Sequence, residues 1–169
     1  MEEDFIRRKT PHAASEKDML ETFLDLQRAI LLWKIDGLGI EDLRRLMVPS
    51  GVSLLGLVKH IAYVEQNWFQ VVFEGEDFED IPWSDEDPDA DFRIEPGDSY
   101  GSIVAFYRRQ IARSREIVAE ARSLEETPRR EGRDETLRWI MVHMIEETAR
   151  HIGHADIFRE LIDGQTGHS

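Results

Sequence analysis

The residues best suited to chemistry lie close together near the C-terminal end of the chain, in the segment HMIEETARHIGHAD at 143–156. This segment contains three histidines and two adjacent glutamates, and neutral imidazole and carboxylate are common ligands of divalent metals. The chain has no cysteine, which excludes disulfides, thiolate ligands and a cysteine nucleophile of its own. The segment therefore predicts either a metal site or a solvated helix face that is rich in these residue types.

Helical geometry places most of these side chains on one face. Because residues advance about 100° around a helix per position, four members of the segment fall within an arc of about 80°: His143, Glu147, His151 and His154. Glu146 points in another direction, and we interpret it as a solvated or ion-paired side chain. Ionisable groups beside an apolar stripe are costly to bury unless they are paired or bind a metal.

Only residues one turn apart on this face can share an ion. His143 and His151 are about 12 Å apart along the helix axis, whereas metal–ligand bonds are only about 2 Å long. The spacing allows two pairs, His143 with Glu147 and Glu147 with His151, and does not choose between them. Either pair needs a third ligand, and His60 is the only histidine in the middle of another predicted long helix. By itself, His60 can also be read as a core histidine satisfied by one hydrogen bond.

Four long stretches with helical periodicity contain these residues. They begin after Ser15, near Ser53, at Asp98 or Ser99, and after a cap at Asp134, and Gly164 ends the last one. A short helix is also predicted over 40–47. Four long helices without a convincing strand predict an all-α fold, a four-helix bundle. The length of 169 residues predicts a single domain over 1–169.

Residues 74–98 break the helical pattern between the second and third long helices. They contain twelve acidic residues and three prolines. This composition predicts a long acidic loop that is solvated, with a short extended piece around DFRIE at 91–95.

The overall charge limits the partners of the protein. The formal net charge is −14, which argues against binding to a phosphate backbone or an anionic membrane. No apolar run approaches the roughly 20 residues that a membrane span needs, and the first residues lack the apolar stretch of a signal peptide. We therefore expect a cytoplasmic protein that binds neither nucleic acid nor membrane.

Three stretches resemble the DinB-like superfamily of four-helix metalloproteins, especially its largely uncharacterised actinobacterial branch. They are VPSGVSLLGLVKHIAYVEQNWF, EDPDADFRIEPGDS and LRWIMVHMIEETARHIGHADIFRELIDG. The third stretch is the most specific, and the similarity covers about residues 15–164, which we take as the core of the domain. The resemblance implies an up-down-down-up four-helix bundle with the acidic loop between its second and third long helices.

The resemblance also implies a set of metal ligands. Members of the superfamily carry a histidine on the second helix and two ligands four residues apart on the fourth. The related mycothiol-dependent maleylpyruvate isomerases use His, Glu and His, and this pattern falls on His60, Glu147 and His151. His143 and His154 lie one turn to either side of the pair. We predict that these two orient a ligand or act as a general base, with simple hydrogen-bonded helix histidines as the alternative.

Such a ligand set suits Zn²⁺ first, with Ni²⁺, Fe²⁺ and Mn²⁺ as alternatives. Three protein ligands leave a position open, where water or a thiol ionises more readily than in solution. Several relatives resemble S-transferases that activate mycothiol, bacillithiol or glutathione. We therefore expect a thiol-dependent S-transferase or isomerase that acts on a small molecule, with a low-molecular-weight thiol such as mycothiol as cosubstrate.

Two other functions stay open on the sequence. A metal-dependent hydrolase, with His154 or His143 as general base, works without a thiol. A non-catalytic metal-binding or stress-response protein, in which the bundle forms a homodimer, has no turnover at all.

Overall fold

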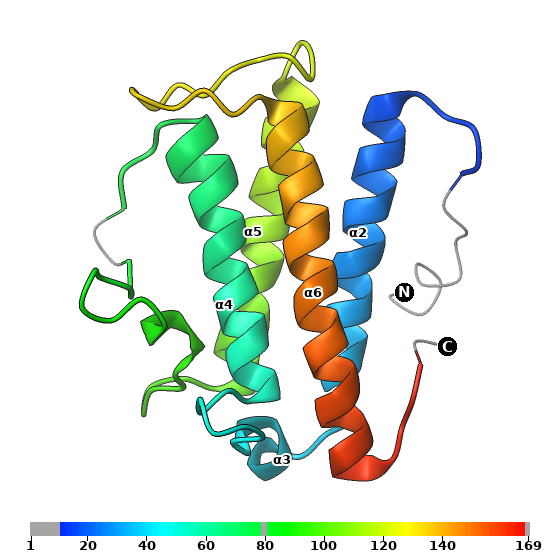
Figure 1. Cartoon of the computed structure of the whole chain (residues 1–169), viewed down its shortest axis with the longest axis vertical. Coiled ribbons are helices and arrows are strands. Elements are labelled where there is room, and N and C mark those ends of the chain that lie inside the picture. The colour runs from blue at the N-terminus through cyan, green and yellow to red at the C-terminus, as the bar shows by residue number, and fades with distance from the viewer. Residues whose placement is uncertain (1–10, 79–80, 168–169) are drawn as a thin grey trace. The chain divides into compact units, whose positions relative to one another are not determined.

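The computed structural model describes residues 11–78 and 81–167 (Figure 1). Within these residues the chain forms five α-helices, α2 to α6, one π-helix, η1, and one 3₁₀-helix, η2, and it contains no strand. The predicted all-α class is therefore confirmed for the described part of the chain. The residues divide into two compact units, one reaching to Leu54 and resuming at Met141, the other covering Leu55–Ile140.

The first unit is built on α2 (Glu16–Ile35) and the greater part of α6 (Leu137–Asp163). The C-terminal ends of these two helices are joined by Arg159, whose Nη1 donates to the carbonyl oxygens of Lys34 at 3.0 Å and Asp36 at 2.8 Å. The two helices therefore run parallel, as Figure 1 shows for α2 and α6.

The second unit is built on α4 (Leu54–Gln66), which continues directly into η1 (Asn67–Phe73), and on α5 (Tyr100–Glu120). Three side-chain hydrogen bonds join these segments or the residues directly beside them, at sequence separations of 39, 40 and 37: Lys59 to Asp98, Gln70 to Gln110, and Arg113 to Glu76. Because the partners advance together along both segments, α4–η1 and α5 run parallel.

An up-down-down-up bundle requires its first long helix to be parallel to its fourth and its second to its third. Both relations are present, each inside one unit. The bundle as a whole stays a prediction.

Several helix boundaries follow the local signals in the sequence. Ser15 caps α2, with its Oγ accepting from the Asp18 amide at 3.2 Å. Ser99 caps α5 and exchanges hydrogen bonds with Ser102 in a capping box. Gly164 ends α6 with a φ of 77°, a left-handed conformation that costs glycine little.

Two boundaries differ from the sequence prediction. The short helix α3 covers only Ile40–Arg44 and not 40–47. The last helix begins at Leu137 and not after Asp134, because Thr136 caps it: the Thr136 Oγ1 accepts from the Trp139 amide at 3.3 Å, and its carbonyl oxygen accepts from the Ile140 amide at 3.0 Å. The Leu137 amide donates to the Glu126 carbonyl at 2.9 Å, which satisfies another backbone donor at this end of the helix.

The segment between η1 and α5 also differs from expectation. Its described residues include η2 (Ala90–Phe92), a single helical turn, where an extended piece is predicted. Asp91 in this turn is only 3% exposed, although the sequence predicts a solvated loop. The segment therefore packs part of its length against the second unit.

None of the helices in the described part of the chain is both long enough and apolar enough to cross a membrane.

The contact of Arg159 with the end of α2 makes a prediction about stability. Arg159 is 7% exposed, and hydrogen bonds from a charged donor contribute about 1.5–3 kcal/mol each. We expect Arg159→Ala to lower the free energy of unfolding by about 3 kcal/mol in urea denaturation, because two carbonyls at the end of α2 lose their donor. Arg122→Ala is the control. The Arg122 side chain is 92% exposed, and the change should stay within about 0.5 kcal/mol. A loss at Arg159 no larger than in the control contradicts this role.

Candidate metal site

The predicted ligands belong to different units of the structure. His60 lies on α4 in the second unit, and Glu147 and His151 lie on α6 in the first, together with His143 and His154.

His60 is held by two neighbouring residues of η2. Its Nδ1 lies 2.8 Å from Oδ2 of Asp91, and its ring stacks on Phe92 with centroids 3.9 Å apart and planes 13° apart. The side chains of His60 and Asp91 are 13% and 4% exposed. A carboxylate that accepts from Nδ1–H selects the neutral tautomer whose Nε2 carries the lone pair. In that tautomer, Nε2 is the atom of His60 that can ligate a metal.

The residue before His60 anchors the same segment. Lys59 is 7% exposed, and its Nζ donates to the Arg93 carbonyl oxygen and to Oδ2 of Asp98, both at 2.7 Å. Consecutive residues of α4 therefore bind the loop on both sides of Phe92.

An ion pair between Arg93 and Asp87 also stabilises the loop. The Arg93 side chain hydrogen-bonds Asp87, and this bond lowers the pKa of the Asp87 carboxyl from its ordinary value. Because the pKa of Asp87 is lowered, the stabilisation from this ion pair is fully present above the ordinary pKa of Asp. It is lost as the pH falls through the lowered value. The pair is therefore intact at neutral pH.

The other half of the candidate site is the pair Glu147 and His151, one turn apart on α6. Oε1 of Glu147 lies 3.1 Å from Nε2 of His151, and Oε2 lies 3.3 Å from Nη1 of Arg150. The two side chains of the pair are 15% and 10% exposed. In a tetrahedral site with bonds of about 2.0–2.1 Å, two ligand atoms are about 3.3 Å apart. The observed spacing therefore suits a shared metal ion as well as a shared proton.

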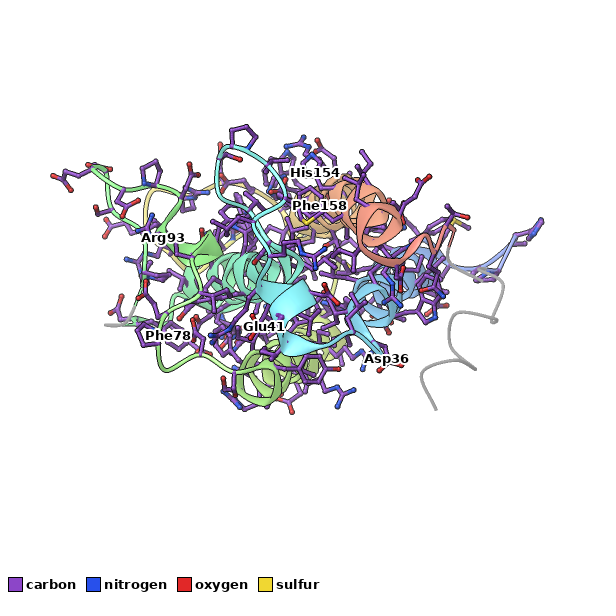
Figure 2. All side chains as sticks on the ribbon, turned by 90° about the horizontal axis from the view of Figure 1, so that it is seen from below. Asp36, Glu41, Phe78, Arg93, His154 and Phe158 are labelled. Atoms are coloured by element: carbon purple, nitrogen blue, oxygen red, sulfur yellow. The ribbon has the colours of Figure 1, made fainter. Side chains whose placement is uncertain are left out.

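The remaining polar residues of this helix differ in their surroundings. His154 is exposed, and its ring lies against that of His151, with centroids 5.5 Å apart and planes 71° apart. Figure 2 labels His154 on α6 together with Phe158, one turn later, and Phe158 is buried. His143 is half-buried. The chemical roles predicted for the two histidines stay predictions.

Glu146 is exposed and forms an ion pair with Arg150. This finding confirms the interpretation of Glu146 as a side chain that takes no part in the cluster.

Known proteins similar to the whole chain indicate its family. The sequence model of the mycothiol-S-transferase family matches residues 19–164. The chain belongs to the mycothiol-S-transferase family. The predicted membership of the DinB-like superfamily is thereby confirmed. No curated protein shows a significant match to this mycothiol-S-transferase family member.

Solved structures give a further comparison for this mycothiol-S-transferase family member. A conserved protein from Enterococcus faecalis has a TM-score of 0.65 and 14% sequence identity, and the match covers 90% of this chain and 100% of that chain. At this identity the likeness shows a shared fold and carries no statement about activity.

The contact of Asp91 with His60 was not predicted from the sequence. Asp91 lies 31 residues from His60, inside a segment whose twelve acidic side chains predict solvent exposure. The neighbouring aromatic residue Phe92 was a local sign that this part of the loop packs against the protein. Nothing in the spacing indicated which acidic residue it brings to His60.

Proposed function

We propose that this protein is a metal-dependent S-transferase that uses a low-molecular-weight thiol such as mycothiol. The observation that carries the proposal is the match of residues 19–164 to the mycothiol-S-transferase family, because the family name joins the thiol to the transfer reaction. Its substrate in this proposal is a small electrophilic molecule, and an isomerase reaction that uses the same thiol is the nearest variant.

We further propose that His60, Glu147 and His151 hold one divalent ion, with zinc as the first choice. Three observations inside the units support this ligand set. Nδ1 of His60 lies within hydrogen-bond distance of Asp91, which leaves Nε2 as the ligand atom, Glu147 and His151 have the spacing of two ligands, and no thiolate in the chain competes for the ion. A shared ion requires α4 and α6 to meet, as they do in the up-down-down-up four-helix bundle that we propose for the whole chain.

The donor set fits a catalytic metal and not a purely structural one. A divalent ion with three protein ligands keeps a coordination position open and lowers the pKa of a thiol that occupies it. Of the three ligands, only Glu147 carries a negative charge, so the site retains the net positive charge that favours a thiolate. We assign His154, which lies against His151 and is open to solvent, the exchange of a proton with the thiol or the substrate. Imidazole exchanges protons readily near neutral pH. His143 is the alternative for this role.

The test is an assay of thiol conjugation with purified protein that has not met a chelator. We expect about one divalent metal ion per chain and conjugation of a chloroarene or an epoxide that requires the added thiol. Hydrolysis of an ester or amide without any thiol favours a hydrolase and contradicts the proposal. A protein that neither contains nor takes up metal, and shows no turnover, indicates the non-catalytic alternative.

The acidic composition and the family membership lead us to propose a cytoplasmic protein that does not bind nucleic acid.

We also propose that the protein forms a homodimer. Size-exclusion chromatography with light scattering tests the dimer directly, and a mass of about 20 kDa, that of the single chain, contradicts it.

A further inference from the structure

We infer that Asp91 is a positioning residue for His60, which it fixes in the one tautomer and ring orientation that leave Nε2 for the metal. The inference rests on the proposed function for the presence of a metal. The orientation of His60 and the position of Asp91 rest on contacts within the second unit. The inference assigns a role to the loop before α5, whereas the proposed function names only the metal ligands and the neighbouring histidines.

The contacts to His60 constrain it in two independent ways. The hydrogen bond from Nδ1 to Asp91 fixes the rotation of the imidazole about its own axis. The stacking on Phe92, with planes 13° apart, fixes the plane of the ring. A ring held in both respects loses little conformational entropy when it binds an ion.

Asp91 is itself held in place and shielded from solvent. It belongs to the single turn of η2, and Lys59 binds the residues that follow through the Arg93 carbonyl oxygen and the Asp98 carboxylate. A carboxylate that is only 4% exposed is costly to bury without a partner, and the Nδ1–H of His60 is such a partner.

The expected energetic effect follows from other metal sites. A carboxylate that accepts a hydrogen bond from a ligand histidine raises the basicity of the ligating nitrogen. Its loss typically lowers metal affinity about 10–100-fold. We therefore expect Asp91→Ala to raise the Kd for Zn²⁺ by about 10–100-fold. We expect Asp91→Asn to raise it less, because an amide oxygen still accepts from Nδ1–H but carries no charge.

The matched control is Asp89→Asn. It removes the same charge from the same loop, and Asp89 is exposed and makes no side-chain cap to η2. Zn²⁺ affinity is measured by competition with a chromophoric chelator. Circular dichroism of each variant shows whether it is folded. An Asp91→Ala protein that is folded and binds Zn²⁺ as tightly as the Asp89→Asn protein overturns the inference.

A second measurement needs no metal and no variant of Asp91. In the metal-free wild-type protein at pH 8, ¹⁵N NMR of the His60 ring should report a protonated Nδ1 and an unprotonated Nε2, with assignment from a His60→Gln sample. The opposite tautomer, or an even mixture of both, overturns the inference even if the protein binds metal.

The two measurements also separate this inference from the proposed function. If the wild-type protein takes up no metal, the proposed function fails, and the tautomer still decides the role of Asp91. If the metal is present and His60-dependent but insensitive to Asp91→Ala, the positioning role fails and the proposed function stands.

Discussion

His60→Ala, Glu147→Ala and His151→Ala are each expected to lower the affinity for Zn²⁺ by more than about 100-fold. The loss of a hydrogen-bond partner of a ligand histidine already costs about 10–100-fold, and the loss of a ligand itself must cost more. Equilibrium dialysis followed by metal analysis measures the effect, and the metal content of each purified variant should fall from about one per chain to nearly none.

The controls for this experiment come from the same chain. His12→Ala removes a histidine that is exposed and lies outside the matched residues 19–164, and its metal content should be unchanged. His143→Ala separates the two pairs that helical spacing allows. If His143→Ala removes the metal while His151→Ala does not, the ligand pair is His143 with Glu147 and our assignment is wrong.

Removal of the metal is expected to slow thiol conjugation by about 100-fold or more, and added Zn²⁺ should restore the rate. A metal that acts as a Lewis acid is worth several kcal/mol, and each 1.36 kcal/mol is about tenfold in rate. The measurement is the conjugation rate before and after treatment with a chelator, with circular dichroism to show that the treated protein is folded. An unchanged rate in the metal-free folded protein contradicts a metal-dependent transferase.

The pH dependence of the same reaction gives an independent check. The reactive species is the thiolate, and a free thiol has a pKa of about 8.5. The uncatalysed rate therefore falls about tenfold for each pH unit below that value. The rate with the metal-loaded protein should fall much less between pH 8 and pH 6, because the thiol ionises at lower pH in the site. Parallel slopes for the two reactions contradict the proposed role of the metal.

The local signals in the sequence predicted most of the helices. Ser15, Ser99 and Gly164 mark ends of helices through contacts with near neighbours, so their effect can be read from a short stretch of sequence. Thr136 marks the start of α6 in the same way, but Asp134, two residues earlier, is at least as good a cap by residue type, so the prediction chose the wrong one. The contact of the Leu137 amide with the Glu126 carbonyl depends on the path of the preceding loop and has no local signal.

The helix predicted over 53–73 has the expected extent, but its hydrogen-bond pattern changes at Asn67, where η1 begins. Apolar residues cover most of the circumference of this helix, and such a pattern does not distinguish an α-helix from a π-helix. A π-helix within an α-helix is rare, and no residue pattern in this segment predicts one.

The candidate site was predictable to a similar degree. The four-residue spacing of Glu147 and His151 indicated a pair on one helix face, and the structure places their side chains 3.1 Å apart. The contact between His60 and Asp91 depends on the fold of the intervening loop, and only the three-dimensional structure shows it. Ligands on the same helix could be predicted from their spacing in the sequence, whereas a hydrogen-bond partner supplied by a loop could not.

The most direct test of the account is a crystal structure of protein purified without chelators, with an anomalous difference map at the zinc absorption edge. We predict one strong peak about 2.0–2.2 Å from Nε2 of His60, from a carboxylate oxygen of Glu147 and from a ring nitrogen of His151. A map without a peak after zinc soaking, or a His60 ring directed into solvent away from Glu147, contradicts the proposed metal centre and the chemistry built on it.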